Sequence, residues 1–108
     1  MRITISARHC EVSDALRERA AAVATRLAEL SPHALDATVV FDAAPLIHSV
    51  ELRLHARGRK MLVGAGQGPD HRTALDRAEE KLRGQLLKAS AVRQSARRGS
   101  GRPRARTP

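Results

Sequence analysis

One stretch of this chain decides its fold: Asp70-His71-Arg72-Thr73-Ala74-Leu75-Asp76-Arg77-Ala78-Glu79-Glu80-Lys81-Leu82-Arg83-Gly84-Gln85-Leu86-Leu87-Lys88. Its apolar side chains recur at steps of three and four residues, the spacing of one face of an α-helix. The buried stripe consists of Leu75, Ala78, Leu82, Leu86 and Ala89. The carboxylate of Asp70 is placed to accept hydrogen bonds from the unpaired N–H groups of the first turn. The stretch therefore predicts a capped amphipathic helix that packs through a single face.

The exposed side of this helix is unevenly charged. At about 100° per residue, Arg77, Lys81 and Lys88 share one flank of the buried stripe, with no carboxylate among them. The opposite flank mixes both signs: Arg72, Asp76, Glu79 and Arg83. A charged row on a helix is often only a solvated face, but a rigid row of cations is also suited to binding a polyanion. Arg77, Lys81 and Lys88 are thus candidate anion-binding residues.

The rest of the chain up to residue 65 predicts four strands and one further helix. Apolar and polar residues alternate over 2–7, 37–42, 49–57 and 61–65, the period of strands with one buried face. A second apolar stripe at helical spacing runs from residue 16 to 30, after a capping Ser13 and before Ser31-Pro32. We predict an α+β fold of order β-α-β-β-β-α, in which a four-stranded sheet carries both helices on one face. Arg53 and His55 are expected on the opposite, solvated face, and the glycine-rich residues 64–69 are interpreted as a flexible turn.

Length and charge narrow the class of protein. The 108 residues suffice for one small domain, which we predict to span residues 1–91, followed by a disordered basic tail over residues 92–108. The net charge is +9, and six of the 20 basic residues lie beyond Val92. Such a charge favours a nucleic acid or an anionic surface as partner. Phe41 is the only aromatic residue other than histidine, which disfavours recognition by base stacking.

Several classes of chemistry lack a signature. Cys10 is the only cysteine, so no internal disulfide forms, and neither a signal peptide nor a long apolar run is present. We therefore expect a cytoplasmic protein. His9-Cys10-Glu11 lacks the spacing of a metal site, and no catalytic motif stands out. We expect no cofactor, no metal and no enzymatic activity, with an enzyme that uses His9 and Cys10 as a distant alternative.

The first helix adds two cations beside its own buried stripe. Arg19 and Arg26 are seven residues apart, which places them on one side of that helix. We expect the two helices to border a positively charged groove.

Three stretches in unbroken order together resemble the ribosome hibernation-promoting factor and ribosome-associated inhibitor family. They are Met1-x-Ile3-x-Ile5-x-Ala7-Arg8-His9-x-Glu11-Val12-Ser13-Asp14-Ala15-Leu16-Arg17, His48-x-Val50-Glu51-x-x-Leu54-His55, and Asp70-x-x-x-Ala74-Leu75-Asp76-x-Ala78-x-x-Lys81-Leu82-x-x-Gln85-Leu86-x-Lys88. The resemblance covers about residues 1–90 and is to the short form of the family. It implies the same β-α-β-β-β-α fold and binding to the small ribosomal subunit and its ribosomal RNA, in the messenger and transfer RNA channel of idle ribosomes. By position, Lys81 and Lys88 match basic residues of the family, with Arg77 and Arg83 as neighbours.

The sequence thus favours a ribosome-binding translation inhibitor without enzymatic activity, a monomer off the ribosome that uses neither a membrane nor a small-molecule substrate. The predicted RNA-binding residues are Arg77, Lys81, Arg83, Lys88, Arg19 and Arg26. The main alternative is a generic structured-RNA-binding or ribosome-assembly protein on the same fold, because composition and periodicity alone indicate only a small basic RNA binder.

Overall fold

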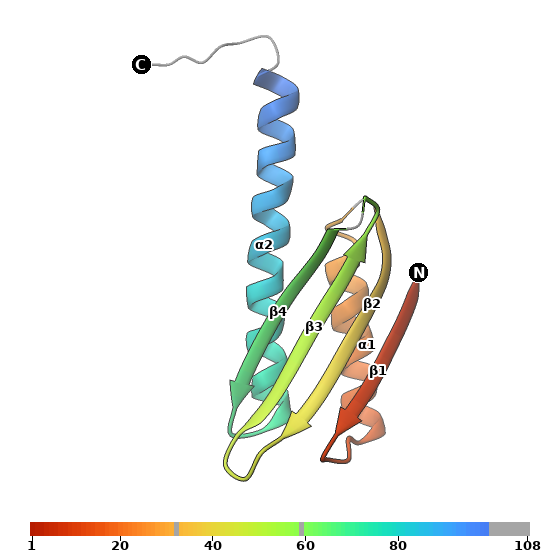
Figure 1. Cartoon of the computed structure of the whole chain (residues 1–108), viewed down its shortest axis with the longest axis vertical. Coiled ribbons are helices and arrows are strands. Elements are labelled where there is room, and N and C mark those ends of the chain that lie inside the picture. Colours follow the sequence, from red (N-terminus) through yellow and green to blue (C-terminus); the bar gives the residue numbers. More distant parts are fainter. Residues whose placement is uncertain (32, 59, 100–108) are drawn as a thin grey trace.

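Six elements follow one another in the predicted order. The structure, a computed structural model, describes residues 1–31, 33–58 and 60–99. The elements are β1 (Arg2–Arg8), α1 (Asp14–Ala28), β2 (Ala34–Ala43), β3 (His48–Ala56), β4 (Lys60–Gly68) and α2 (His71–Gly99) (Figure 1). The predicted α+β class and the β-α-β-β-β-α order are confirmed.

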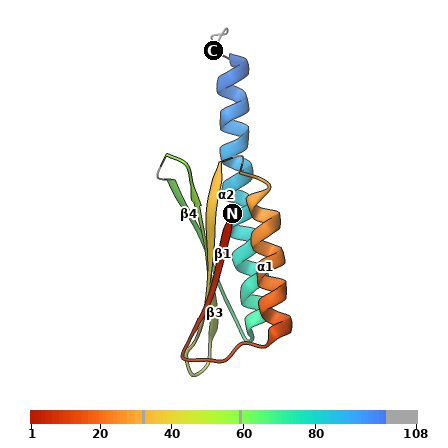
Figure 2. The ribbon, with the colours of Figure 1, turned by 90° about the vertical axis from the view of Figure 1, so that its right-hand side faces the viewer.

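The four strands form one sheet in the order β1-β2-β3-β4. β1 is parallel to β2, and α1 makes the crossover that a parallel pair requires, whereas β3 is antiparallel to both of its neighbours. Both helices cover the same face, as the side view shows (Figure 2). α1 packs over β1 and β2, and α2 packs over β3 and β4. This arrangement confirms the prediction of two helices on one face.

The core lies between the sheet and the helices, and each predicted apolar stripe faces it. The alternating residues of β2 and β3 are buried there together with the stripe of α2: Ala37, Val39, Phe41, Val50, Leu52, Leu54, Leu75, Ala78, Leu82 and Leu86. Both predicted caps are present. The Oγ atom of Ser13 accepts a hydrogen bond from the N–H of Leu16 at 3.1 Å, and a carboxylate oxygen of Asp70 accepts one from the N–H of Thr73 at 2.7 Å.

The opposite face of the sheet carries polar side chains, as predicted for Arg53 and His55. The guanidinium of Arg53 binds the carboxylate of Glu51 through Nη2 at 2.6 Å, and Nδ1 of His55 lies 3.4 Å from the carboxylate of Asp36. Met61 and Val63 also lie exposed on β4, with exposed fractions of 52% and 38%. This face is therefore solvated but not uniformly polar.

The interpretation of residues 64–69 as a flexible turn is wrong. β4 continues through Gly68, and its glycines lie against α2. A Cβ atom at Gly64 would lie 2.8 Å from the carbonyl oxygen of Ala78, and one at Gly66 would lie 2.3 Å from that of Ala74. Glycine is required here because the helix backbone approaches the strand more closely than any side chain permits.

The predicted end of the last helix is also wrong. We expected a disordered tail from residue 92, but α2 continues to Gly99. Residues 89–98 contain no glycine or proline and are rich in alanine and arginine, which favour the helix. The helix thus runs through the predicted boundary between residues 91 and 92. The division into a domain and a basic tail stays a prediction. Residues 100–108 lie outside the described part of the chain.

Candidate nucleic-acid interface

The predicted cationic row lies on a helix that is fixed to the sheet. Leu75, Leu82 and Leu86 are each at most 2% exposed, and the glycines of β4 bring α2 close to the strand. On the solvent side, Arg77, Lys81 and Lys88 are all exposed. Because packing fixes the rotation of the helix about its axis, it also fixes the side from which these three residues project.

Arg77 is held further by the edge of the sheet. Its Nη1 atom donates a hydrogen bond of 2.7 Å to the carbonyl oxygen of Gln67. Eight residues later on the same helix, Nε2 of Gln85 donates one of 2.7 Å to the carbonyl oxygen of Val63. β4 is an edge strand, and these two side chains satisfy carbonyl groups that no further strand can pair.

Gln85 is a residue that the sequence reasoning missed. A signal for it exists, since residues 77, 81 and 85 follow one another at steps of four and therefore lie in one line along the helix. Lys81 stands between the two side chains that bind the edge carbonyls.

A groove of about 700 Å³ runs between α2 and β4. Its lining consists of Ala65, Gly66, Gln67, Arg77, Glu80 and Lys81. The presence of Glu80 corrects the expectation of a flank without carboxylates: the boundary between the two flanks is less sharp than the ideal angle of 100° per residue suggests. Arg77 and Lys81 still give this groove one positive charge in excess, so its chemistry suits an anion.

Arg83 lies in a different environment. It lines a second, shallower hollow on the outer side of α2. The other residues of this hollow are Thr73, Asp76, Arg77, Glu79 and Glu80. Three of them are carboxylates, so Arg83 lies in a more acidic environment than Lys81.

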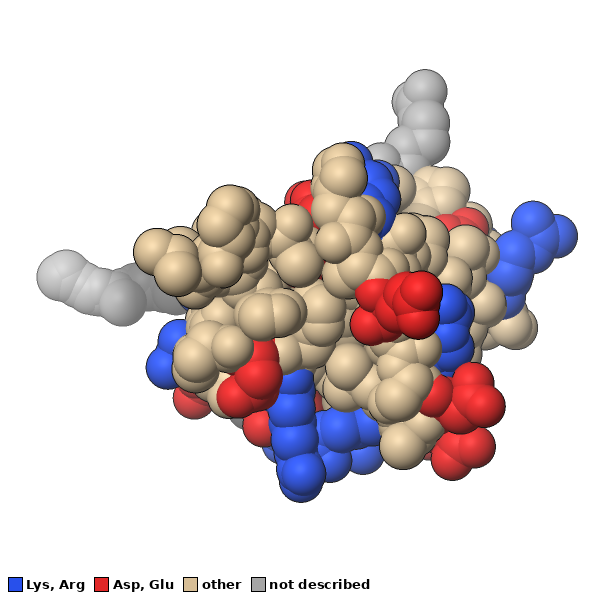
Figure 3. All heavy atoms as spheres, turned by 90° about the horizontal axis from the view of Figure 1, so that it is seen from below, with Lys and Arg blue, Asp and Glu red and all other residues tan. Residues whose placement is uncertain are grey.

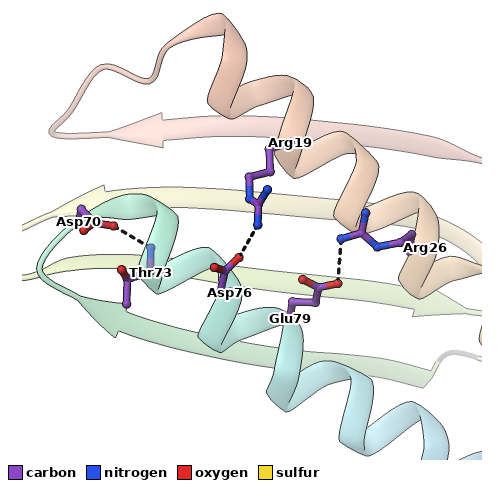
Figure 4. A network of polar contacts seen from close by, with 6 residues as sticks. All are labelled: Arg19, Arg26, Asp70, Thr73, Asp76 and Glu79. Atoms are coloured by element: carbon purple, nitrogen blue, oxygen red, sulfur yellow. Dashed lines mark hydrogen bonds and ion pairs between the residues drawn. The ribbon is translucent and has the colours of Figure 1, made fainter.

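The two cations of α1 are paired with carboxylates of α2. Nη2 of Arg19 lies 3.0 Å from a carboxylate oxygen of Asp76, and Nη2 of Arg26 lies 3.1 Å from one of Glu79 (Figure 4). The expectation of a positively charged groove between the helices is therefore wrong for these residues, because each guanidinium faces a carboxylate. Solvent-accessible pairs of this kind are worth up to about 1 kcal/mol each, and both of them connect α1 to α2.

Two carboxyl groups lie near the start of α2, and both are shifted toward the ionised form. The hydrogen bond from the N–H of Thr73 holds the pKa of Asp70 below its usual value of 3.8. The pKa of Asp42 is lowered mainly by the hydrogen bond with the ring of His9, whose Nδ1 lies 3.0 Å away. His9 is thus engaged with Asp42, and the neighbouring Cys10 is half-buried against the core.

The described residues hold neither a cluster of metal ligands nor a membrane-spanning helix. Within residues 1–31, 33–58 and 60–99, no group of three or more histidine, cysteine, aspartate or glutamate side chains is arranged to hold a metal ion. None of the helices in the same ranges combines the length and the apolar character needed to cross a membrane.

The geometry defines a small α+β domain with a rigid cationic helix flank, and comparison with known proteins places it in a family. The sequence model of the family described as sigma 54 modulation protein / S30EA ribosomal protein matches residues 3–94, and the chain belongs to this family. No curated protein sequence matches the chain closely enough to count as a relative.

Two solved structures are similar to this fold. A ribosomal subunit interface protein from Coxiella burnetii is 22% identical, with a TM-score of 0.76, over 84% of this chain and 99% of that one. The N-terminal domain of Protein Y from Thermus thermophilus is 26% identical, with a TM-score of 0.72, over 82% of this chain and 99% of that one. The described fold is therefore the fold of these proteins.

Proposed function

We propose that this protein binds the small ribosomal subunit in the channel for messenger and transfer RNA and inhibits translation by idle ribosomes. Membership of the S30EA ribosomal protein family supports a role on the ribosome. The observation that carries the proposal is the row formed by Arg77, Lys81 and Lys88 on a helix that packing holds in one orientation. We assign these three residues as the main contact with ribosomal RNA.

The physical argument rests on preorganisation. The phosphates of a folded RNA have fixed positions, so cations that are also fixed before binding lose little conformational entropy when they meet them. Arg77 is oriented by its hydrogen bond to Gln67, and the buried leucines of α2 fix the side of the helix from which Lys81 and Lys88 project. Shape and charge are then sufficient for recognition of a structured RNA.

The same surface lacks an exposed phenylalanine, tyrosine or tryptophan among the described residues. Phe41 is 0% exposed, so the single aromatic residue other than histidine serves the core. A binder of single strands normally needs exposed aromatic platforms. This favours a folded RNA over a flexible one as the partner.

The remaining predicted residues take secondary roles in the proposal. Arg19 and Arg26 are matched by Asp76 and Glu79, and Arg83 lies among carboxylates, so their net attraction for phosphate is weaker than that of Lys81 and Lys88. Contact of these three arginines with RNA remains a prediction.

The test is the double variant Lys81→Glu/Lys88→Glu, assayed by co-sedimentation with purified small ribosomal subunits and by translation in a purified system. Loss of two charge-assisted contacts predicts a fall in affinity of about 100-fold or more, together with relief of inhibition. A matched control is Arg2→Glu/Arg57→Glu, which changes the net charge equally at exposed sites on β1 and just after β3 and is expected to bind nearly as well as the wild type.

Three results would count against the proposal. Retained sedimentation and inhibition by the lysine variant would place the anchor elsewhere. An equal loss in the control would reduce the effect to net charge. Chemical protection of ribosomal RNA only outside the channel would favour the alternative, a generic structured-RNA-binding or ribosome-assembly protein.

A further inference from the structure

The tip of the β2–β3 hairpin exposes apolar side chains at one end of the molecule. Leu46 is 91% exposed and the adjacent Ile47 is 44% exposed. The tip lies at the end of the sheet where α1 and α2 begin, opposite the projecting end of α2 (Figure 1). Viewed toward this end, a large part of the surface is neither acidic nor basic, and charged side chains of both signs lie around it (Figure 3).

Hydrogen bonds close the hairpin tip. The N–H of Ala44 donates to the carbonyl oxygen of Ile47 at 2.8 Å, and the N–H of Ile47 donates back at 3.3 Å. The base of the hairpin is tied to two other elements through Asp42. Its carboxylate lies 3.0 Å from Nδ1 of His9, and its carbonyl oxygen accepts a hydrogen bond of 2.9 Å from Nε2 of His71. An apolar contact made by this tip would therefore cost little conformational entropy.

Folding does not require an apolar residue at position 46. Leu46 contributes nothing to the core, and its backbone has no positive φ that would restrict the choice of residue. Turns of this kind usually carry polar residues or glycine. Single exposed leucines are common, but two adjacent apolar side chains on a projecting, hydrogen-bonded tip have the form of an anchor that enters a recess on a partner.

The charges at this end identify the kind of partner. The β1–α1 connection and the first turns of α1 expose Glu11, Asp14 and Glu18. The whole end, over residues 8–18, 42–48 and 67–73, carries five carboxylates against three arginines, although the chain has a net charge of +9. An acidic surface repels phosphate and attracts cationic side chains.

We propose that this end is a protein-docking surface, in which Leu46 and Ile47 enter an apolar recess on a basic protein while Glu11, Asp14 and Glu18 face its cations. The inference rests on the proposed function, because the partner is then a basic protein of the small subunit beside the RNA site. The RNA contact through α2 and the protein contact through the hairpin involve separate sets of residues.

The first test uses Leu46→Ser/Ile47→Ser, with Met61→Ser as a matched control at another exposed apolar site. Co-sedimentation with purified small subunits is expected to show about a tenfold weaker affinity for the hairpin variant and an unchanged affinity for the control. A photo-crosslinking amino acid at position 46 is expected to join a protein chain. Crosslinks to RNA alone, or wild-type affinity of the hairpin variant, would overturn the inference.

The second test uses the sign of a charge effect. Glu11→Lys and Glu18→Lys are expected to weaken binding several-fold if the partner is a basic protein, and to strengthen it if the partner is RNA. Glu29→Lys, at the far end of α1, is the control for net charge. Stronger binding of the first two variants would refute the docking surface. If the wild-type protein fails to sediment with the subunit, the proposed function falls together with the inference. If Lys81→Glu/Lys88→Glu loses binding while the hairpin and glutamate variants bind like the wild type, only the inference falls.

Discussion

Replacing Gly66 with alanine tests the contact between β4 and α2 on which the cationic row depends. The added methyl group would lie 2.3 Å from the carbonyl oxygen of Ala74 and 2.5 Å from the backbone nitrogen of Ala78, whereas ordinary contacts begin at 3.4 Å. Both neighbours belong to the helix backbone, so no side chain can rotate away. The helix as a whole must move by about 1 Å, a shift at which packed atoms lose a quarter to a half of their dispersion energy.

This displacement gives the expected magnitude. Overpacking of a core costs about 1–3 kcal/mol, and a clash with backbone belongs at the upper end of that range. We expect Gly66→Ala to lower the free energy of unfolding by about 3 kcal/mol, which corresponds to a fall in Tm of about 10–20 °C for a domain of this size. Thermal unfolding followed by circular dichroism at a fixed pH measures it.

Gly84→Ala is the matched control, because it is the same chemical change on the exposed side of α2. A Cβ atom at Gly84 meets nothing within 4 Å, so the substitution is expected to stabilise the helix by about 1 kcal/mol through its propensity. The two variants should therefore shift Tm in opposite directions. A Gly66→Ala protein with the Tm of the wild type would refute the close contact between strand and helix.

Two further predictions concern the ends of α2. Because the contact with Thr73 lowers the pKa of Asp70 below 3.8, its ionised form stabilises the folded state above that pH, and the stabilisation is lost as the pH falls through the lowered value. Asp70→Asn keeps an N-cap but cannot titrate, so its Tm should fall less than that of the wild type between about pH 5 and about pH 3. Removal of residues 95–108 takes away five arginines. This truncation should weaken ribosome binding and flatten its salt dependence, because the removed arginines add affinity through their charge. The protected RNA positions should stay unchanged, and a shifted protection pattern would show that these residues also select the site.

Local periodicity accounts for the parts of the fold that the sequence predicts well. The stripe of α2 and the alternation of β3 each report a buried face within one segment, so Leu82 and Leu52 are identified without knowledge of their partners. The caps at Ser13 and Asp70 are equally local. The order of the elements, and the placement of both helices on one face of the sheet, follow from these signals.

The errors arise where one segment meets another. Gly64 and Gly66 resemble a turn in composition, and only the presence of α2 above them explains why glycine is needed within a strand. The step of two residues between these glycines is the period of a strand, and it is the signal in the sequence that indicates a strand here. The pairing of Arg19 with Asp76 joins residues 57 positions apart and depends on the register between two helices, which no local pattern specifies.

The length of α2 beyond the sheet has a consequence for how its last turns form. Leu86 is the last residue of its stripe buried in the core, yet the helix continues for 13 residues, about 20 Å, to Gly99. A separate peptide of that length is only marginally helical, because nucleation of the first turn is costly. Here the packed half of α2 supplies the nucleus, and the remaining turns are added by propagation. Shortening the chain from Gly99 should therefore remove helical turns one by one, whereas loosening the packed half should melt the whole helix.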